Sequence, residues 1–177
     1  MTAGRPFPGV VLVGFMGSGK SAVGKALARR LRADFVDTDE RIERTAGKTI
    51  PEIFSGEGEP AFREREKTAL REALSVPGRV VATGGGAFLS GENRAMLSAY
   101  GPVVYLEASA ETLVARLGEK SGRPLLQGGD PGATVRDLLA RRTSGYRLAD
   151  HTVATDGLTV EEVADRVGRL LAETEAP

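Results

Sequence analysis

Eight residues near the beginning of the chain restrict its fold more than any other part of the sequence. Residues 14–21 read G-F-M-G-S-G-K-S and match the pattern G-x-x-x-x-G-K-S/T. They follow a β-branched run at residues 10–13 and precede residues 20–31, whose apolar side chains recur at helical spacing. A strand that passes through a glycine-rich turn into a helix begins a βα unit, and repeated βα units build a parallel sheet.

The same eight residues have the composition of a phosphate-binding loop. Gly17 and Gly19 allow the backbone to curl so that successive N–H groups point at one anion. The helix that starts near Lys20 adds a partial positive charge, the Lys20 ammonium reaches the β- and γ-phosphates of a nucleotide, and the Ser21 hydroxyl suits Mg²⁺. A glycine-rich turn with a chance Lys-Ser pair is the alternative, but strand, spacing and helix together favour the phosphate site.

Short apolar runs alternate with amphipathic stretches along the rest of the chain. The predicted strands are residues 10–13, 34–37, 79–83, 102–107 and 151–155. The predicted helices are residues 20–31, 60–74, 91–100, 110–117, 134–147 and 160–171. Near-continuous apolar strands are typical of a parallel sheet covered on both faces. We therefore predict an α/β, three-layer sandwich with a central five-stranded parallel sheet.

Two segments are more than such a sheet requires. Residues 39–74 form a long, charged and mostly helical excursion between the second and third strands. Residues 118–132 are rich in glycine and are either a flexible surface loop or a lid that closes over a ligand. We predict a single domain, 1–177, with a core at about residues 10–172, a substrate-binding region at about 38–74 and a lid at about 118–132.

Composition excludes several classes of protein. With 24 basic and 24 acidic residues the formal net charge is zero, whereas nucleic-acid-binding domains usually carry a basic excess. The absence of cysteine excludes zinc ribbons, iron–sulfur clusters and thiol catalysis. No run approaches the roughly 20 apolar residues of a membrane span, and the first residues are typical of neither a signal peptide nor an anchor. We expect no nucleic-acid or membrane partner, and a monomer is the default because no apolar stripe is obvious.

Five motifs resemble those of the shikimate kinases in order and in spacing. They are GFMGSGKSAVG at 14–24, DTD at 37–39, FREREK at 62–67, GGGA at 84–87 and RPLL at 123–126. The resemblance, which covers about residues 10–155, implies a P-loop NTPase-type fold. It implies transfer of the γ-phosphoryl group of MgATP to the 3-hydroxyl of shikimate by a cytoplasmic enzyme of aromatic amino acid biosynthesis. The absence of the Asn-Lys-x-Asp motif, by which a GTPase reads guanine, agrees with a small-molecule kinase.

The resemblance assigns one group of residues to the nucleotide and its metal. The ATP-binding residues are Gly17, Ser18, Gly19, Lys20, Ser21, Ala22, Arg116 and Arg123. Arg116 is expected to stack on adenine, although it also reads as a surface side chain, and Arg123 to neutralise charge on the transferred phosphoryl group. Mg²⁺ is expected on Ser21 and, through water, on Asp37, a residue that is equally suited to cap the following helix.

A second group is assigned to shikimate. The substrate-binding residues are Asp39, Arg63, Gly84, Gly85, Gly86, Arg142, Phe54 and Phe62. The two arginines are expected to bind the substrate carboxylate, the glycines to approach the substrate, and the phenylalanines to wall the pocket. Asp39 is expected to accept hydrogen bonds from the substrate hydroxyls and to take the proton, so Lys20, Asp39 and Arg123 form the catalytic set.

Without the resemblance, several of these residues have plainer interpretations. Arg63 reads as part of a solvated helix face paired with Glu66, the three glycines as a flexible turn, and the phenylalanines as core packing. The sequence also departs from the family at two places: Ala22 stands where threonine is usual, and residues 153–159 lack a basic, proline-containing adenine loop. A kinase for another polyol acid such as gluconate, or a nucleotide-gated binding module without turnover, are the alternative functions.

Overall fold

The five predicted strands form one parallel sheet in the computed structural model, which describes residues 7–118 and 130–174. The strands are β1 (Val10–Val13), β2 (Phe35–Asp37), β3 (Val80–Ala82), β4 (Val103–Glu107) and β5 (His151–Ala154). Their order across the sheet is β2-β3-β1-β4-β5, and each neighbouring pair is parallel. The predicted strands are confirmed to within one residue at each end.

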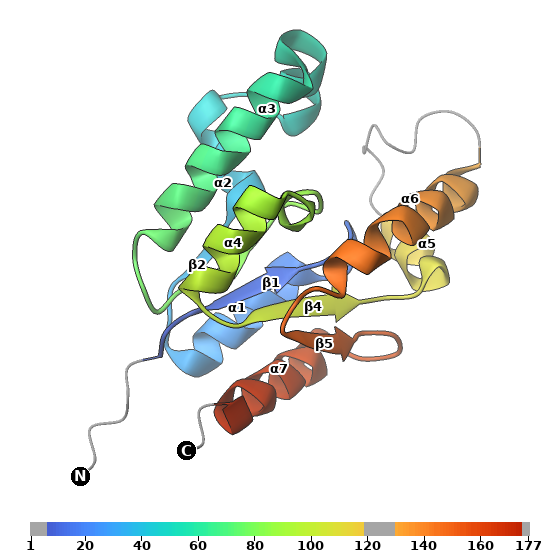
Figure 1. Cartoon of the computed structure of the whole chain (residues 1–177). Helices are drawn as coiled ribbons and strands as arrows, with labels where there is room; N and C mark the ends of the chain where they lie inside the picture. The colour runs from blue at the N-terminus through green and yellow to red at the C-terminus, as the bar shows by residue number, and fades with distance from the viewer. Residues whose placement is uncertain (1–6, 119–129, 175–177) are drawn as a thin grey trace.

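Helices cover both faces of this sheet, and the chain therefore has three layers (Figure 1). The helices α1 (Lys20–Leu31) and α7 (Val160–Thr174) pack on one face, and α4 (Gly91–Tyr100), α5 (Ala110–Gly118) and α6 (Pro131–Tyr146) on the other. In β1, Val10 and Leu12 lie in the core under α1 and α7, while Val11 and Val13 lie in the opposite core. All four side chains are fully buried, which confirms the predicted three-layer α/β sandwich.

The excursion between β2 and β3 folds into two helices, α2 (Thr38–Ala46) and α3 (Ile50–Leu74), which rise from one end of the sheet (Figure 1). They enclose a small core of their own, formed by Ile42, Ile53, Phe62 and Ala69. The sequence predicted a helix only from residue 60, but α3 begins at Ile50 behind a capping box of Thr49 and Glu52. Gly58, with φ 84°, and Pro60 interrupt the helical pattern there, and the helix resumes beyond them.

The remaining boundaries lie near the predicted ones. A short turn of 3₁₀ helix, η1 (Ala87–Leu89), follows the three glycines, and α6 begins at Pro131 behind the capping residue Asp130. Of the predicted lid, residues 119–129 and with them Arg123 lie outside the described residues; Gly118 ends α5, and residues 130–132 belong to the start of α6. In the described part of the chain, no helix is both long enough and apolar enough to cross a membrane.

Candidate active site

The carboxyl ends of three adjacent strands bring the predicted site residues to one edge of the sheet. Residues 14–21 follow β1, Asp37 ends β2, and the three glycines follow β3 after Thr83. Because β1 and β2 both neighbour β3 and all three run in the same direction, these segments meet in one crevice.

Residues 14–21 form the phosphate cradle between β1 and α1. Gly17 and Gly19 have φ angles of 82° and 96°, a left-handed conformation that favours glycine. Gly19 precedes the first helical residue, and no side chain caps the amino end of α1. Among the described residues, Gly19 offers these first-turn N–H groups no capping side chain, which suits a helix end that binds an anion. Ala22 lies exposed on the first turn of α1.

Lys20 lies inside the cradle rather than pointing into solvent. Its side chain is buried, and its ammonium donates hydrogen bonds to the carbonyl oxygens of Gly14 at 2.8 Å and Phe15 at 2.9 Å. These bonds hold the charge against the loop where phosphate oxygens are expected. A cation in a partly desolvated loop interacts more strongly with an anion than one in water does.

Ser21 and Asp37 meet at the edge of the cradle. The Ser21 hydroxyl donates a 2.5 Å hydrogen bond to Oδ2 of Asp37, so two hard oxygen donors lie together. Among the described residues, no group of three or more histidine, cysteine, aspartate or glutamate side chains could hold a metal. A hydroxyl and a carboxylate beside a phosphate site fit Mg²⁺, which takes few protein ligands and fills its shell with phosphate oxygens and water.

Asp37 also caps α2, as one of the two interpretations of this residue predicts, and its metal role stays a prediction. Its Oδ1 accepts hydrogen bonds from the backbone N–H groups of Asp39 at 3.0 Å and Glu40 at 3.3 Å, while Oδ2 faces Ser21. The cap fixes the first turn of α2, and the half-buried Asp39 lies in that turn. The Asp39 carboxylate reaches the glycine segment: a methyl group placed on Gly84 would lie 2.6 Å from its Oδ1.

Gly84, Gly85 and Gly86 form the middle of the crevice and are called the glycine loop below. A methyl group on Gly85 would lie 3.5 Å from the backbone nitrogen of Met16 and 3.8 Å from Nη1 of Arg142. One on Gly86 would lie 3.1 Å from Nη1 of Arg63. The loop thus lies between the phosphate cradle, two guanidinium groups and the Asp39 carboxylate, and side chains at these positions would fill the space between them.

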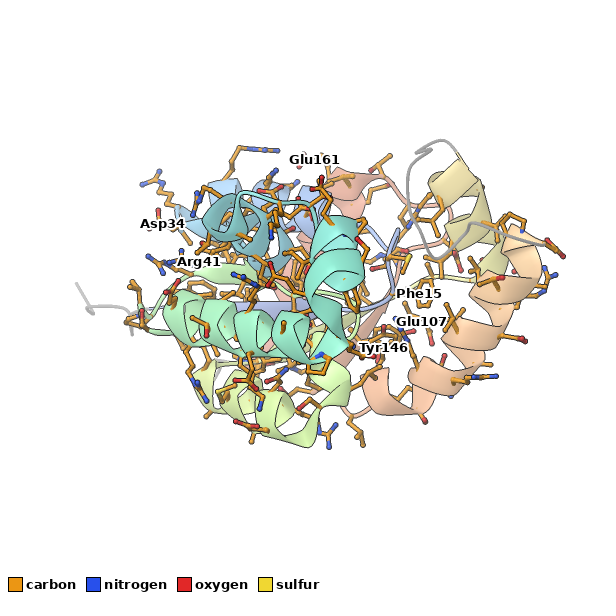
Figure 2. All side chains as sticks on the ribbon, turned by 90° about the horizontal axis from the view of Figure 1, so that it is seen from above. Phe15, Asp34, Arg41, Glu107, Tyr146 and Glu161 are labelled. Atoms are coloured by element: carbon orange, nitrogen blue, oxygen red, sulfur yellow. The ribbon has the colours of Figure 1, made fainter. Side chains whose placement is uncertain are left out.

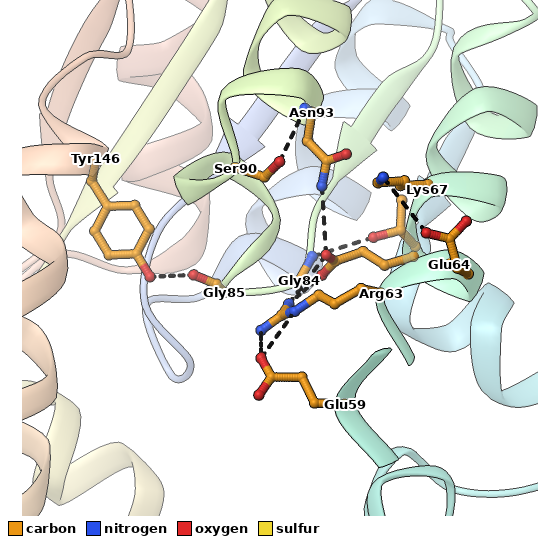
Figure 3. Close-up of polar contacts among 11 residues, drawn as sticks. Glu59, Arg63, Glu64, Lys67, Gly84, Gly85, Ser90, Asn93 and Tyr146 are labelled. Carbon is orange, nitrogen blue, oxygen red and sulfur yellow. Dashed lines mark hydrogen bonds and ion pairs between the residues drawn. The ribbon is translucent and has the colours of Figure 1, made fainter. Parts of the chain in front are cut away.

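Arg63 is held from two sides by glutamates of its own helix (Figure 3). Its Nη1 donates to Oε2 of Glu66 at 3.1 Å, and its Nη2 donates to Oε1 of Glu59 at 2.9 Å. Glu66 is only 2% exposed and also accepts a bond from Asn93, whereas Glu59 is 63% exposed. Burial raises the pKa of Glu66, and the charge and hydrogen bonds of Arg63 act against that rise.

Arg142 approaches the glycine loop from α6. Its guanidinium carbon lies 5.7 Å from the centre of the Phe15 ring, a cation–π contact with a residue of the cradle. Phe15 and Tyr146, both labelled in Figure 2, belong to one hydrophobic core. The adjacent Arg141 is exposed, so of the two neighbouring arginines it is Arg142 that lies beside the loop.

Phe54 and Phe62 stack on each other near Arg63. Their ring centres are 4.5 Å apart, and the guanidinium of Arg63 lies 5.3 Å from the Phe62 ring. Phe62 is almost fully buried in the small core under α2 and α3, so the core-packing interpretation is correct for this residue. Phe54 is 38% exposed and presents apolar surface.

Arg116 contacts backbone rather than open solvent. Its Nη1 donates to the carbonyl oxygens of Gly17 and Ser18 at 3.4 Å, and its Nη2 donates to the carbonyl oxygen of Thr155 at 3.2 Å. The side chain therefore ties the phosphate cradle to the loop after β5. This position borders the cradle, and adenine stacking by Arg116 stays a prediction.

Several residues of the site had no assigned role in the sequence analysis. Thr38, fully buried, accepts a 3.2 Å hydrogen bond from the N–H of Gly84, and the Tyr146 hydroxyl donates to the carbonyl oxygen of Gly85 (Figure 3). Glu59 and Asn93 complete the surroundings of Arg63 and Glu66. The one available signal was for Tyr146, which lies one helical turn after Arg142 and on the same helix face.

Comparison with known proteins gives one consistent family. The shikimate kinase family model matches residues 16–172. A shikimate kinase of Pseudomonas aeruginosa is 47% identical over 166 residues, which cover 91% of this chain and 96% of the relative. A shikimate kinase of Cereibacter sphaeroides is 47% identical over 163 residues, which cover 92% of this chain and 82% of the relative.

Solved structures agree with the sequence relatives. The shikimate kinase from Acinetobacter baumannii in complex with shikimate superposes with a TM-score of 0.92 at 41% identity, covering 97% of this chain and 96% of that one. A gluconokinase from Sinorhizobium meliloti has a TM-score of 0.61 at 22% identity, covering 97% and 95% of the two chains. The similarity to the Acinetobacter baumannii structure confirms the predicted P-loop NTPase-type fold. At 22% identity the gluconokinase shows the fold alone, so it does not support the gluconate alternative.

Proposed function

Because this chain belongs to the shikimate kinase family, we propose that its crevice residues divide between the two substrates of that reaction. The chain is an ATP-dependent kinase that phosphorylates shikimate in aromatic biosynthesis. The observation that carries the residue assignment is the position of the glycine loop between the phosphate cradle, Asp39 and two arginines. The negative phosphates of the donor, on one side of this loop, and the carboxylate of a hydroxylated acid, on the other, each face positively charged groups.

We assign the nucleotide phosphates to the cradle. The first-turn N–H groups of α1 and the Lys20 ammonium face the phosphates, and Ser18, Ser21 and Ala22 line the turn around them. Ser21 and Asp37 would hold Mg²⁺, Asp37 through water, and the ion would supply positive charge for the phosphate oxygens when bound. Arg116 lies at the adenine end and Arg123 acts on the transferred phosphoryl group.

We assign shikimate to the opposite side of the glycine loop. Its ring carboxylate binds the guanidinium groups of Arg63 and Arg142, because planar guanidinium and carboxylate groups pair through two parallel hydrogen bonds. Its hydroxyls lie toward Asp39, which accepts the proton of the 3-hydroxyl as that oxygen attacks the γ-phosphorus. Phe54 and Phe62 cover the ring, and the backbone of the glycine loop fits against the substrate because it carries no side chains.

Catalysis in this assignment consists of positioning and electrostatics. Lys20 and Arg123 stabilise charge that develops between the phosphates, and Asp39 holds the attacking hydroxyl within reach. No covalent intermediate with the protein is required. Release of ADP should depend on shikimate, whereas an equal concentration of gluconate or no acceptor should leave ADP at the background rate. Equal ADP release with and without shikimate would contradict acceptor binding in this crevice.

Arg63→Ala is expected to raise the KM for shikimate by roughly thirtyfold, which corresponds to about 2 kcal/mol, with the KM for ATP nearly unchanged. The substitution removes one of the two guanidinium groups assigned to the substrate carboxylate and leaves Arg142 as its charged partner. Arg65→Ala is the matched control, because Arg65 lies on the same helix with similar exposure and pairs with Glu57. Steady-state kinetics with each substrate varied separates the effects. A similar rise in KM for both variants would mean that the charge of α3, and not the position of Arg63, binds shikimate.

Glu59→Gln is expected to lower the KM for shikimate two- to threefold, an effect of about 0.5 kcal/mol that is typical of an exposed ion pair. Glu59 occupies the Nη2 side of Arg63, where the substrate carboxylate has to bind, so the two carboxylates compete for one guanidinium. Glu64→Gln is the control, since Glu64 is exposed on α3 and pairs with Lys67 instead. An increase in KM for Glu59→Gln would instead show that Glu59 supports Arg63 in the complex.

The monomeric state and the cytoplasmic location are among the sequence predictions that stay predictions. The same holds for the absence of nucleic-acid and membrane partners. Sedimentation of the purified chain with and without both substrates measures the oligomeric state directly.

A further inference from the structure

The hydroxyl of Tyr146 lies behind the glycine loop, on the side that faces the protein interior. Tyr146 is the last residue of α6 and is fully buried, and its hydroxyl donates a short hydrogen bond to the carbonyl oxygen of Gly85 (Figure 3). No role in the reaction assigned above uses this hydroxyl. It nevertheless touches the peptide unit at the centre of the proposed shikimate site.

The bond to Gly85 fixes more than one atom. A trans peptide unit is planar, so the carbonyl of Gly85 and the N–H of Gly86 point in opposite directions. Holding the carbonyl toward Tyr146 therefore directs the N–H of Gly86 away from the Tyr146 hydroxyl. Glycine has no side chain to restrict its backbone, so the orientation of this peptide depends on such a contact.

The other ends of the glycine loop have their own anchors. The N–H of Gly84 donates to Oγ1 of Thr38, and the carbonyl of Gly84 accepts from the N–H of Ala87 at 3.1 Å. The carbonyl of Gly86 accepts from the N–H of Leu89 at 3.2 Å. None of these bonds involves the carbonyl of the Gly85–Gly86 peptide. Its hydrogen-bond partner is the Tyr146 side chain.

Arg142 lies one turn earlier on α6, and its guanidinium and the Tyr146 hydroxyl both reach Gly85. Burial raises the pKa of Tyr146, and the charge and hydrogen bonding of Arg142 act in the opposite direction. Nη1 of Arg142 also lies 3.8 Å from the methyl position of Gly85. Tyr146, Arg142 and the Gly85 peptide therefore form one cluster, with Tyr146 as its buried member.

We propose that Tyr146 is a positioning residue for the acceptor: its hydroxyl holds the Gly85–Gly86 peptide and the Arg142 guanidinium in the arrangement that binds the shikimate carboxylate and ring. This inference rests on the proposed binding of shikimate at the glycine loop. Tyr146 does not touch the reacting atoms, and it acts through Gly85 and Arg142. Loss of its hydroxyl should therefore weaken shikimate binding more than the chemical step.

A purely structural role is the competing explanation, and the chain contains a matched control for it. Tyr146 stacks on Tyr105, with ring centres 5.1 Å apart and planes inclined by 23°. Tyr105 is 1% exposed, burial raises its pKa to about 12, and its hydroxyl interacts with Thr143 of α6. Tyr105→Phe therefore removes a buried hydroxyl from the same stack without removing a contact to the glycine loop.

The test compares Tyr146→Phe with Tyr105→Phe in the full chain. Tyr146→Phe keeps the stacked ring and is expected to raise the KM for shikimate, and its dissociation constant measured without nucleotide, about tenfold, because the carbonyl of Gly85 loses its partner. Its kcat and KM for ATP should stay within about twofold of wild type. Tyr105→Phe should leave all four constants within about twofold while lowering the thermal midpoint at least as much as Tyr146→Phe does.

Two results would overturn the proposal. One is an unchanged shikimate KM in Tyr146→Phe with a lowered thermal midpoint, and the other is an equal rise in KM in both variants.

Arg142→Lys supplies a second measurement. Since Tyr146 acts partly through Arg142, the loss of shikimate-binding free energy in the double variant should be smaller than the sum of the losses in the two single variants. Additive losses of binding free energy contradict the proposal. If Arg63→Ala and Arg142→Lys both bind shikimate normally, the proposed site itself is wrong, an outcome distinct from failure of Tyr146→Phe alone.

Discussion

Replacing Lys20 by alanine is expected to lower kcat at least about a hundredfold, a loss of roughly 3 kcal/mol or more of transition-state stabilisation. The ammonium is buried in the cradle and already bonded to the carbonyls of Gly14 and Phe15, so its charge is positioned before the nucleotide binds. Charge that is held in place costs no reorganisation when the β- and γ-phosphates separate. Single-turnover measurement of ADP formation at saturating shikimate reports this step.

A control for this loss is available on the same helix. Lys25 lies on α1, is half exposed and pairs with Glu40 on the surface, so Lys25→Ala should keep kcat within about twofold. The fold of both variants is checked by their thermal midpoints. Near-normal turnover by a folded Lys20→Ala protein would contradict a role of the cradle in phosphoryl transfer, whichever other ligand the crevice binds.

Replacing Asp39 by asparagine is expected to lower kcat by roughly a hundredfold or more, with little change in the KM for ATP. Asparagine keeps the shape and can still hydrogen-bond, but it cannot take a proton or supply a negative charge next to the attacking hydroxyl. Asp39 lies in the first turn of α2, and its carboxylate reaches the glycine loop at Gly84. Its location fits a group that acts on the acceptor rather than on the nucleotide.

The two kinetic constants distinguish the roles of Asp39. A large fall in kcat with shikimate KM little changed indicates a base or an electrostatic group, whereas a rise in KM at constant kcat makes Asp39 a binding residue only. Glu40→Gln is the matched control, because Glu40 is the next residue of α2 and its carboxylate pairs with Lys25. Its kcat should remain near that of the wild type.

Much of the fold could be predicted from the sequence because most of the strands are near-continuous apolar runs. Val10–Val13 alternates between two cores, and this explains why polar residues are absent from β1. The start of α3 was placed too late, because Gly58 and Pro60 predict a break and outweighed the capping pattern of Thr49 and Glu52 that precedes them. Thr49 and Glu52 begin the helix, whereas Gly58 and Pro60 mark a break that the packing of Ile53 and Phe62 bridges.

The candidate site was predictable in its parts but not in its internal contacts. Arg63 and Glu66 have the spacing of an ordinary surface pair, and only the fold shows that Glu66 is buried behind Arg63 against Asn93. Tyr146 was missed for a similar reason. Its hydroxyl bonds to Gly85, which lies 61 positions earlier in the chain, and a contact between residues so far apart leaves no local sequence pattern.

The small core beneath α2 and α3 has a consequence for how acceptor choice can change during evolution. Ile42, Ile53, Phe62 and Ala69 pack among themselves, and α3 joins the larger core of the sheet through Leu70 near its carboxyl end. Substitutions at these four core positions therefore change the packing beneath Phe54 and Arg63 without touching the side chains of β1. Selection can reshape this wall of the proposed acceptor site by repacking a core that the phosphate cradle does not share, whereas the glycine loop and Arg142, which lie against the cradle, are constrained by both substrates.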